Sequence, residues 1–294
     1  MLRKILGSPK LNEGHKESTA AEERWAEVSG GKLRYLVQGS GAPLLLLHGI
    51  VASSFSFRLV SPELSRELRL FLPDMRVAGA DASLKATASR LLELLDQEGI
   101  EAADVLGSSH GGAVAMEMSA MAPERIRRLI LVSPANPFAR GYHGVVNFYL
   151  SLSGGIVIRL APFAPIPIWE YAMRRMCGRA SRLATDIGFG YRQPLRERGM
   201  TAHIRSSLQT FIAEIEALRA KLPDLSKIAT LLIWGDRDPV VELDSGRQLQ
   251  QALGAEMIVI PGIGHLPYEE SPEEFSRIVL KYLRIGPSGD RVIG

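Results

Sequence analysis

The sequence has almost no cysteine: Cys177 is the single one among 294 residues. An intramolecular disulfide is therefore impossible, which favours a reducing compartment, and we expect a cytoplasmic protein. No Cys-His signature surrounds Cys177, so it is expected to pack in a helix and not to act as a nucleophile. Residues 1–10 include basic side chains but no continuous apolar run, and they do not predict a Sec-type signal peptide.

Strong charge of either sign is also lacking. The net charge of +3 is small for this length, and no compact Lys/Arg run with interleaved aromatics occurs, so a nucleic-acid partner is not expected. Hydrophobic content of 46% and charged content of 23% are typical of a globular protein and argue against disorder.

An uninterrupted membrane-spanning run is absent too. The stretch 145–169 is apolar enough to resemble one, but glycines and prolines that would break a spanning helix interrupt it, namely Gly154, Gly155, Pro162, Pro165 and Pro167. We therefore expect no stable membrane insertion. The apolar side chains of this region are expected to cover the active edge of a sheet.

What the sequence does contain is a succession of short apolar strands and amphipathic helices. Alternating patterns around Ser29-Gly30-Gly31 predict a hairpin, and Pro43-Leu44-Leu45-Leu46-Leu47 predicts a strand buried on both faces. Further strands are predicted at 68–74, 103–106, 126–134, 229–234 and 257–260, and helices at 57–67, from 111, at 243–253 and at 272–283. This alternation predicts an α/β protein with a mostly parallel central sheet flanked by helices.

The alternation of strands and helices stops between residues 136 and 227, where buried-strand patterns disappear and helical patches remain. We interpret this segment as a helical cap inserted into a discontinuous core formed by 24–135 and 228–285. Residues 1–23 are expected to be a loose lead-in, and 286–294 a flexible tail. The cap's arginines more often indicate a solvated helix face than an anionic ligand; they are Arg174, Arg175, Arg179 and Arg182.

A nucleophile-elbow motif follows the predicted strand at 103–106. Gly107-Ser108-Ser109-His110-Gly111 fits the pattern G-x-S-x-G, in which a tight strand-helix turn exposes the central serine. Side chains at Gly107 and Gly111 would collide with the backbone of such a turn. The following helix would direct its positive end at the site and favour negative charge there.

Three other strand ends carry polar groups. His48-Gly49 follows the buried strand at 43–47, and a backbone N–H just beyond, that of Ile50, is expected to face a reacting oxygen. His48 itself is expected to hold the turn. An aspartate (Asp236 or Asp238) and then His265 follow the strands at 229–234 and 257–260, which gives the chain order Ser…Asp…His.

With these motifs the chain resembles the α/β-hydrolase superfamily of serine hydrolases, of the type with a helical cap after the sixth strand. The resemblance covers roughly residues 24–283 and implies a catalytic triad of Ser109, Asp238 and His265, since G-x-x-D selects Asp238. It also implies oxyanion donors at the backbone N–H groups of Ile50 and His110. Two features depart from relatives: His110 replaces a more usual Met, Leu, Phe or Gln, and the loop from Met75 to Asp81 has fewer glycines.

The expected activity is hydrolysis of an ester-like or carbon–carbon bond next to a carbonyl, in a small to medium, mostly apolar substrate. A serine at the elbow argues against the dehalogenases and epoxide hydrolases of this fold, which have Asp there. No cofactor and no metal are expected, and the partner is a small-molecule substrate; a homodimer is left open. The alternatives are a small-ligand receptor on the same fold and a haloperoxidase- or lyase-type activity of the same triad.

Overall fold

The computed structural model describes residues 20–178 and 183–285. The predictions for the N-terminal lead-in up to residue 19, including the one on a signal peptide, fall outside these ranges. So do those for the tail from residue 286 and for Arg179 and Arg182. Residues 22 and 23, which the sequence assigns to the lead-in, already belong to the first strand.

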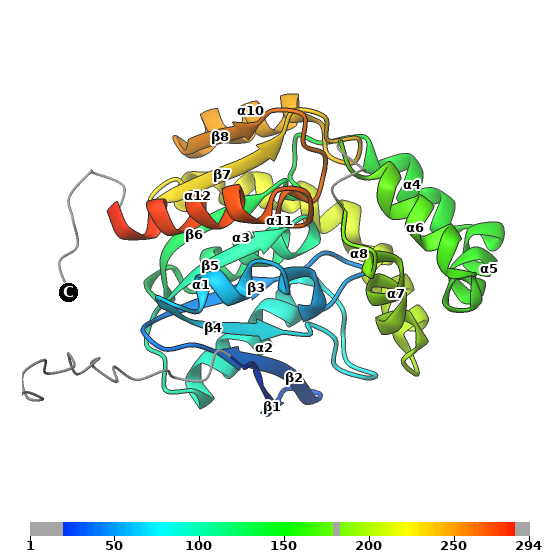
Figure 1. Ribbon diagram of the computed structural model, residues 1–294, viewed down its shortest axis with the longest axis horizontal. Helices are drawn as coiled ribbons and strands as arrows, with labels where there is room; N and C mark the ends of the chain where they lie inside the picture. The colour runs from blue at the N-terminus through cyan, green and yellow to red at the C-terminus, as the bar shows by residue number, and fades with distance from the viewer. Residues whose placement is uncertain (1–19, 179–182, 286–294) are drawn as a thin grey trace, which may run out of the picture.

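A single sheet of eight described strands forms the centre of the molecule, in the order β1-β2-β4-β3-β5-β6-β7-β8 (Figure 1). β2 is antiparallel to both β1 and β4, and the remaining neighbours are parallel. The predicted fold class and hairpin are thereby confirmed. The strands are β1 (Glu22–Val28), β2 (Gly31–Gln38), β3 (Ala42–Leu47), β4 (Leu68–Pro73), β5 (Ala103–Ser108), β6 (Ile126–Val132), β7 (Thr230–Gly235) and β8 (Glu256–Ile260).

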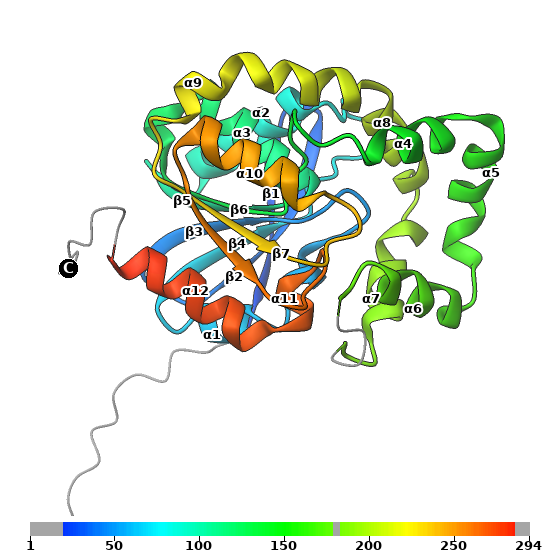
Figure 2. The same ribbon diagram turned by 90° about the horizontal axis from the view of Figure 1, so that it is seen from above.

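Helices cover both faces of the sheet, which is why its central strands are apolar on both sides. Figure 2 shows α1 and α12 on one face and α2, α3 and α10 on the other. The bounds are α1 (Ser61–Leu64), α2 (Leu84–Gln97), α3 (His110–Met121), α10 (Leu243–Leu253), α11 (Pro267–Glu270) and α12 (Pro272–Ile285).

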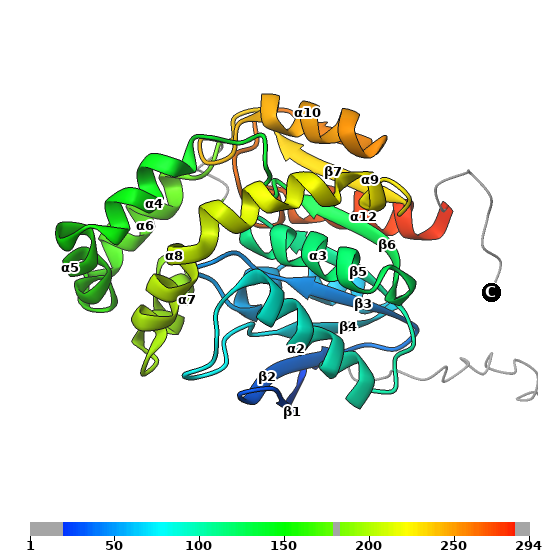
Figure 3. The same ribbon diagram turned by 180° about the vertical axis from the view of Figure 1, so that it is seen from behind.

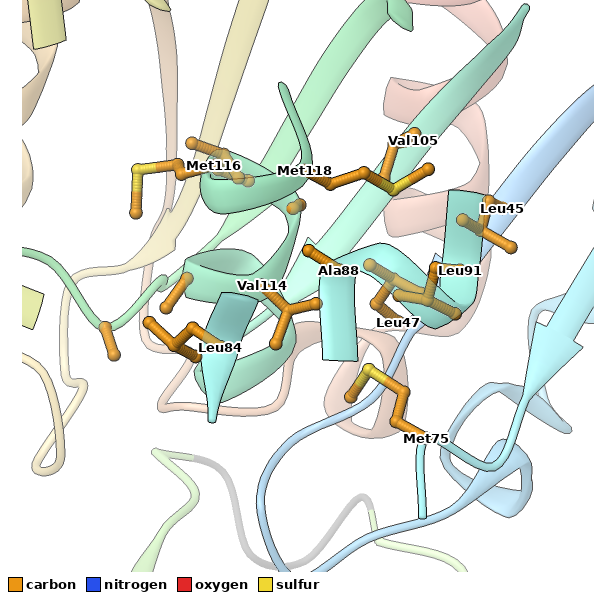
Figure 4. Close-up of a cluster of buried hydrophobic side chains, with 14 of the residues drawn as sticks. Leu45, Leu47, Met75, Leu84, Ala88, Leu91, Val105, Val114, Met116 and Met118 are labelled. Atoms are coloured by element: carbon orange, nitrogen blue, oxygen red, sulfur yellow. The ribbon is translucent and has the colours of Figure 1, made fainter. Parts of the chain in front are cut away.

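The alternation of side chains along β3 divides the core into two clusters. Leu45 and Leu47 pack with Leu91 of α2 and Val114 of α3 (Figure 4). Leu44 and Leu46 belong to the cluster on the other face, under α12. Because successive strand residues point to opposite faces, the run of leucines fills both clusters, and none of the four is exposed.

The predicted helix over 57–67 is wrong. The chain instead forms a 3₁₀ turn, η1 (Ser54–Phe57), and then the four-residue helix α1. Ser53 accepts a hydrogen bond from the N–H of Phe55 and so starts η1 early. Pro62 has no N–H and occupies the first turn of a new helix, which ends after Leu64.

Every described secondary-structure element between β6 and β7 is helical, as expected for the segment 136–227. Its helices are α4 (Tyr142–Leu150), α5 (Leu152–Leu160), η3 (Ala161–Phe163), α6 (Ile166–Arg175), α7 (Ile187–Arg192), η5 (Gln193–Arg196), α8 (Met200–Ala217), η6 (Leu218–Lys221) and α9 (Leu222–Leu225). Figure 3 shows α8 running from this cap across the face of the sheet that α3 covers. Leu218, Leu222 and Leu225 are buried in the core cluster beneath, so η6 and α9 pack as part of the core layer.

Candidate active site

Ser109 occupies the turn between β5 and α3 in a strained backbone conformation. Its φ of 52° and ψ of −117° lie in a region that non-glycine residues rarely adopt. Strain of this kind persists only where surrounding structure imposes it. Here the N–H of Ser109 donates to the carbonyl of Val132, and its carbonyl accepts from the N–H groups of Gly112 and Ala135, each at 3.0 Å. The turn is therefore fixed by β6 and by the loop after it.

The two motif glycines allow the close approach that this turn requires. A Cβ at Gly107 would overlap the carbonyl oxygen of Gly111, and a Cβ at Gly111 would overlap the carbonyl of Leu47. These neighbours are backbone atoms that cannot move aside. A larger residue at Gly111 would separate the elbow from β3, and one at Gly107 would separate the end of β5 from α3.

Asp238 and His265 form a buried, oriented pair. His265 Nδ1 lies 2.8 Å from Asp238 Oδ2, and the two side chains are 2% and 0% exposed. The other carboxylate oxygen accepts hydrogen bonds from the N–H groups of Val240 and Val241, at 2.8 and 3.0 Å. Because the carboxylate can only accept, Nδ1 carries the hydrogen and Nε2 is left as a proton acceptor.

Asp236, the other aspartate that the sequence pattern offered, has a different role. Its Oδ1 accepts the N–H of Gly262 at 2.5 Å and so fixes the loop that precedes His265. Of the two carboxylates, only that of Asp238 contacts the imidazole.

Ser109 and His265 belong to neighbouring loops, but within residues 20–178 and 183–285 no hydrogen bond joins the Ser109 hydroxyl to the imidazole. The contact between the two segments is made by the residue before Ser109 and by a residue shortly after His265. The hydroxyls of Ser108 and Tyr268 lie 3.2 Å apart and are both buried. This contact places the residue before Ser109 against the helix, α11, that begins two residues after His265.

Two backbone N–H groups are available near Ser109. A Cβ built on Gly49 would lie 3.7 Å from Ser109 Cβ, so the loop that carries Ile50 adjoins the serine. His110 is the first residue of α3, where an N–H has no partner within the helix. Neither N–H has a hydrogen-bond partner among the described residues. Both can therefore donate a hydrogen bond to a developing oxyanion.

The side chain of His48 fastens this loop to the one after β4. Its Nε2 accepts the N–H of Met75 at 3.1 Å, so Nδ1 carries the hydrogen and donates to the carbonyl of Gly49 at 2.8 Å. Burial lowers the pKa of His48, which keeps the imidazole neutral. Both ring nitrogens are thus used by backbone groups.

The imidazole of His110 contacts the cap. Nε2 lies 3.3 Å from the hydroxyl of Ser207, and the ring stacks on Phe211 with centroids 6.0 Å apart, both on α8. Burial, with smaller contributions from His48 and His203, lowers the pKa of His110 to about 3. Its Nδ1 has no partner in the described part of the chain. His110 is thus a neutral core-to-cap contact.

A cavity of about 380 Å³ has Ile50 and His110 among its lining residues. The core contributes the loops after β3 and β4, and α8 contributes Met200, His203 and Ser207. Ser109, Asp238 and His265 do not line it, so it lies to the side of these three residues. No group of three or more His, Cys, Asp or Glu side chains suited to a metal ion occurs among the described residues.

Comparison with known proteins places this geometry in a family. The family model of the alpha/beta hydrolase fold matches residues 42–272. The chain belongs to the α/β-hydrolase family. Its relatives include lipase 1 of Psychrobacter immobilis, 25% identical over 84% of this chain and 79% of the relative. They also include a 2-hydroxymuconate semialdehyde hydrolase of a Pseudomonas species, 26% identical over 83% of this chain and 88% of the relative.

Solved structures share the same architecture. A meta-cleavage product hydrolase from Pseudomonas fluorescens superimposes with a TM-score of 0.72 at 22% identity, covering 88% of this chain and 97% of that one. A likeness at this identity supports the α/β-hydrolase fold. The curated relatives add that the chain is an enzyme of the hydrolase class.

This α/β-hydrolase also contains a partly buried polar cluster that the sequence analysis did not identify. The Arg58 guanidinium donates to Glu269 Oε1 at 2.6 Å and to both carboxylate oxygens of Asp186, at 2.7 and 3.0 Å. The Tyr191 hydroxyl donates to the same Glu269 oxygen at 3.1 Å. The cluster connects η1, the cap around α7, and α11. Its signal in the sequence was weak, because an arginine beside η1 and a glutamate after His265 resemble ordinary surface charges.

Proposed function

We propose that this α/β-hydrolase is a serine hydrolase whose triad is Ser109, His265 and Asp238. Its substrate would be a small to medium, mostly apolar carbonyl compound with an ester-like or carbon–carbon bond to cleave. The observation that carries the proposal is the buried Asp238–His265 hydrogen bond at the sheet edge where Ser109 occupies a strained turn.

The chemistry follows from these positions. His265 Nε2 takes the hydroxyl proton of Ser109 as the Ser109 oxygen attacks the carbonyl carbon, and the N–H groups of Ile50 and His110 stabilise the oxyanion. Asp238 stabilises the imidazolium. Collapse of the tetrahedral intermediate transfers that proton to the leaving group and forms an acyl-enzyme. A water molecule, deprotonated by the same imidazole, then releases the acid and regenerates Ser109.

The cavity lined in part by Ile50 and His110, whose N–H groups are the proposed oxyanion donors, supports a substrate of modest size. Its lining mixes apolar side chains, such as Met75, Val77 and Met200, with the polar groups of His203 and Ser207. One curated relative is named a lipase and another a semialdehyde hydrolase. Ester and carbon–carbon substrates are therefore the two classes to compare, using nitrophenyl butyrate and 2-hydroxymuconate semialdehyde.

The test combines covalent labelling with turnover. A fluorophosphonate probe is expected to label the wild-type protein and not Ser109→Ala, and turnover of the better substrate should fall by about 10⁴-fold or more. Ser119→Ala is the matched control. The hydroxyl of this buried serine donates to the carbonyl of Ala115 within α3, so its removal should leave labelling of the protein unchanged.

Undiminished turnover in Ser109→Ala would refute the proposal. Absence of labelling in the wild-type protein, with tight binding of the test compounds, would favour a ligand receptor instead. Activity that requires peroxide or a cyanohydrin would favour the haloperoxidase or lyase alternative.

A further inference from the structure

The cap has an apolar surface that is largely exposed in the described chain. On α5, Leu152, Ile156 and Leu160 recur at four-residue spacing and are 91%, 59% and 61% exposed. Gly154 and Ile158 on the opposite side of the same helix are buried. Phe148 in α4 and Phe163 in η3, on the two sides of α5 in the sequence, are also exposed, at 47% and 76%. These five exposed residues are called the outer cap face below.

Such a helix is unusual on a protein surface. A surface helix normally has an apolar side toward the core and a charged side toward water. Between Tyr142 and Ile168, however, Arg159 is the only charged residue, although 23% of the whole chain is charged. From the sequence, these side chains are expected to cover the active edge of the sheet. In the structure, α5 lies far from the sheet (Figures 1 and 2). A monomer in water rarely retains an exposed apolar patch of this kind without a partner.

The shape of the segment suits a helix pair that lies on a bilayer. None of the described helices is by itself long and apolar enough to span a membrane. The pair formed by Tyr142–Leu150 and Leu152–Phe163 reaches that length and apolarity together, but it is bent by 86°. Amphiphilic segments bind in the plane of the interface when apolar side chains enter the acyl region and basic side chains meet the headgroups.

Charge distinguishes a lipid surface from a second copy of the chain. The charge next to the outer cap face is basic: Arg159 on α5 is exposed, and α4, α5 and η3 contain no Asp or Glu. The next helix, α6, contains Glu170 as well as the exposed Arg175. A symmetric pairing through the outer cap face would bring Arg159 against a surface that has no carboxylate. Anionic headgroups supply that countercharge, and each basic residue near such a surface strengthens binding about fivefold.

We propose that the outer cap face docks this protein reversibly on an anionic lipid bilayer, with Leu152 and Phe163 inserted among the acyl chains. The proposal concerns binding and does not depend on hydrolysis. Ser109→Ala is therefore expected to bind vesicles as the wild-type protein does.

The experiment is co-sedimentation of the full chain with vesicles of phosphatidylcholine, with or without phosphatidylglycerol. Binding is expected with phosphatidylglycerol present and should weaken as salt is added. Leu152→Gln/Phe163→Gln should reduce the affinity by about tenfold or more, since each apolar side chain contributes through its burial. Arg159→Glu should reduce it by more than fivefold. Met121→Gln, which removes an exposed apolar side chain from the far end of α3, is the matched control and should bind normally.

Three results would overturn the proposal. One is absence of binding to either vesicle, and another is equal binding to both. The third is a dimer in analytical ultracentrifugation that Leu152→Gln/Phe163→Gln converts to a monomer. Because both side chains are exposed, the double variant should retain wild-type melting temperature and turnover of a soluble ester, so loss of binding cannot be ascribed to unfolding.

Discussion

The backbone N–H of His265 donates a hydrogen bond of 2.8 Å to the carbonyl oxygen of Met176. Met176 follows α6, so the end of that cap helix is bonded directly to the loop of the proposed catalytic base. Gly178 and Gly264 make this approach possible, because a Cβ on Gly264 would lie 2.5 Å from both Gly178 N and Met176 O. The position of the imidazole thus depends on the cap as well as on the core.

Gly264→Ala is expected to lower both stability and turnover. The added methyl group meets backbone atoms, so the cap segment 176–178 must move away from the histidine loop at a cost of about 1–3 kcal/mol. Thermal denaturation and kcat for a nitrophenyl ester measure the two effects. Gly144→Ala is the control, since a Cβ there meets nothing within 4 Å. If Gly264→Ala and Gly144→Ala had the same melting temperature and kcat, the close approach of the cap to the His265 loop would not be needed for stability or turnover.

The two aspartates after β7 should differ sharply in how much kcat falls when each is changed to asparagine. Asp238→Asn presents an amide to His265 Nδ1 and favours the wrong tautomer, for which a loss of about 10⁴-fold in kcat is typical. Asp236→Asn retains an oxygen for the Gly262 N–H and should lose much less. Steady-state kinetics of both variants, with melting temperatures as a check on folding, measure the difference. Comparable losses of kcat in the two variants would contradict the assignment of Asp238 as the triad carboxylate.

Arg58→Met is expected to destabilise the fold by about 3 kcal/mol, because it leaves the Glu269 carboxylate buried without its cation. Burial already raises the pKa of Glu269. Adding Glu269→Gln should recover part of the loss, and urea denaturation of the single and double variants measures the coupling. Arg66→Met provides the comparison: its pair with Glu63 is exposed, so the effect should be within about 1 kcal/mol. A similar loss in both arginine variants would argue against a special role for Arg58.

His110 should make the protein sensitive to mild acid. Its pKa in the folded chain is about 3, lowered from 6.5, so the unfolded chain binds the proton first as the pH falls. Stability contributed by the neutral form is present above pH 6.5 and is lost below it, by about 2 kcal/mol at pH 5. His110→Gln should remove this part of the decline in denaturation curves between pH 7 and pH 5. Ser207→Ala keeps the imidazole and should keep the decline.

The parts of the fold that could be predicted from the sequence are those with a local physical signal. Leu44 to Leu47 require apolar layers on both sides, and this requirement alone indicates a sheet between two layers of helices. The spacing of Gly107, Ser109 and Gly111 follows from the sterics of one turn. The positions of Asp238 and His265 after their strands follow from the direction of a parallel sheet.

The contacts that could not be predicted join residues distant in the chain. Nothing in the sequence around Arg58 indicates that it meets Glu269, 211 residues later. The helical pattern of 200–225 does not reveal that Leu218 and Leu225 pack on the core and not in the cap. Pro62 is a local signal for a new helix start that the predicted helix over 57–67 did not take into account.

The length of α8 determines which side of the cap can change position. Glu214 near one end accepts the N–H of Leu84 from α2 at 3.0 Å, while Met200 and His203 at the other end line the cavity. A continuous helix transmits displacement as a rod does, so this wall of the cavity is held by the core. Substrate entry through movement of the cap would have to come from the side of α5, which lies far from the sheet (Figures 1 and 2).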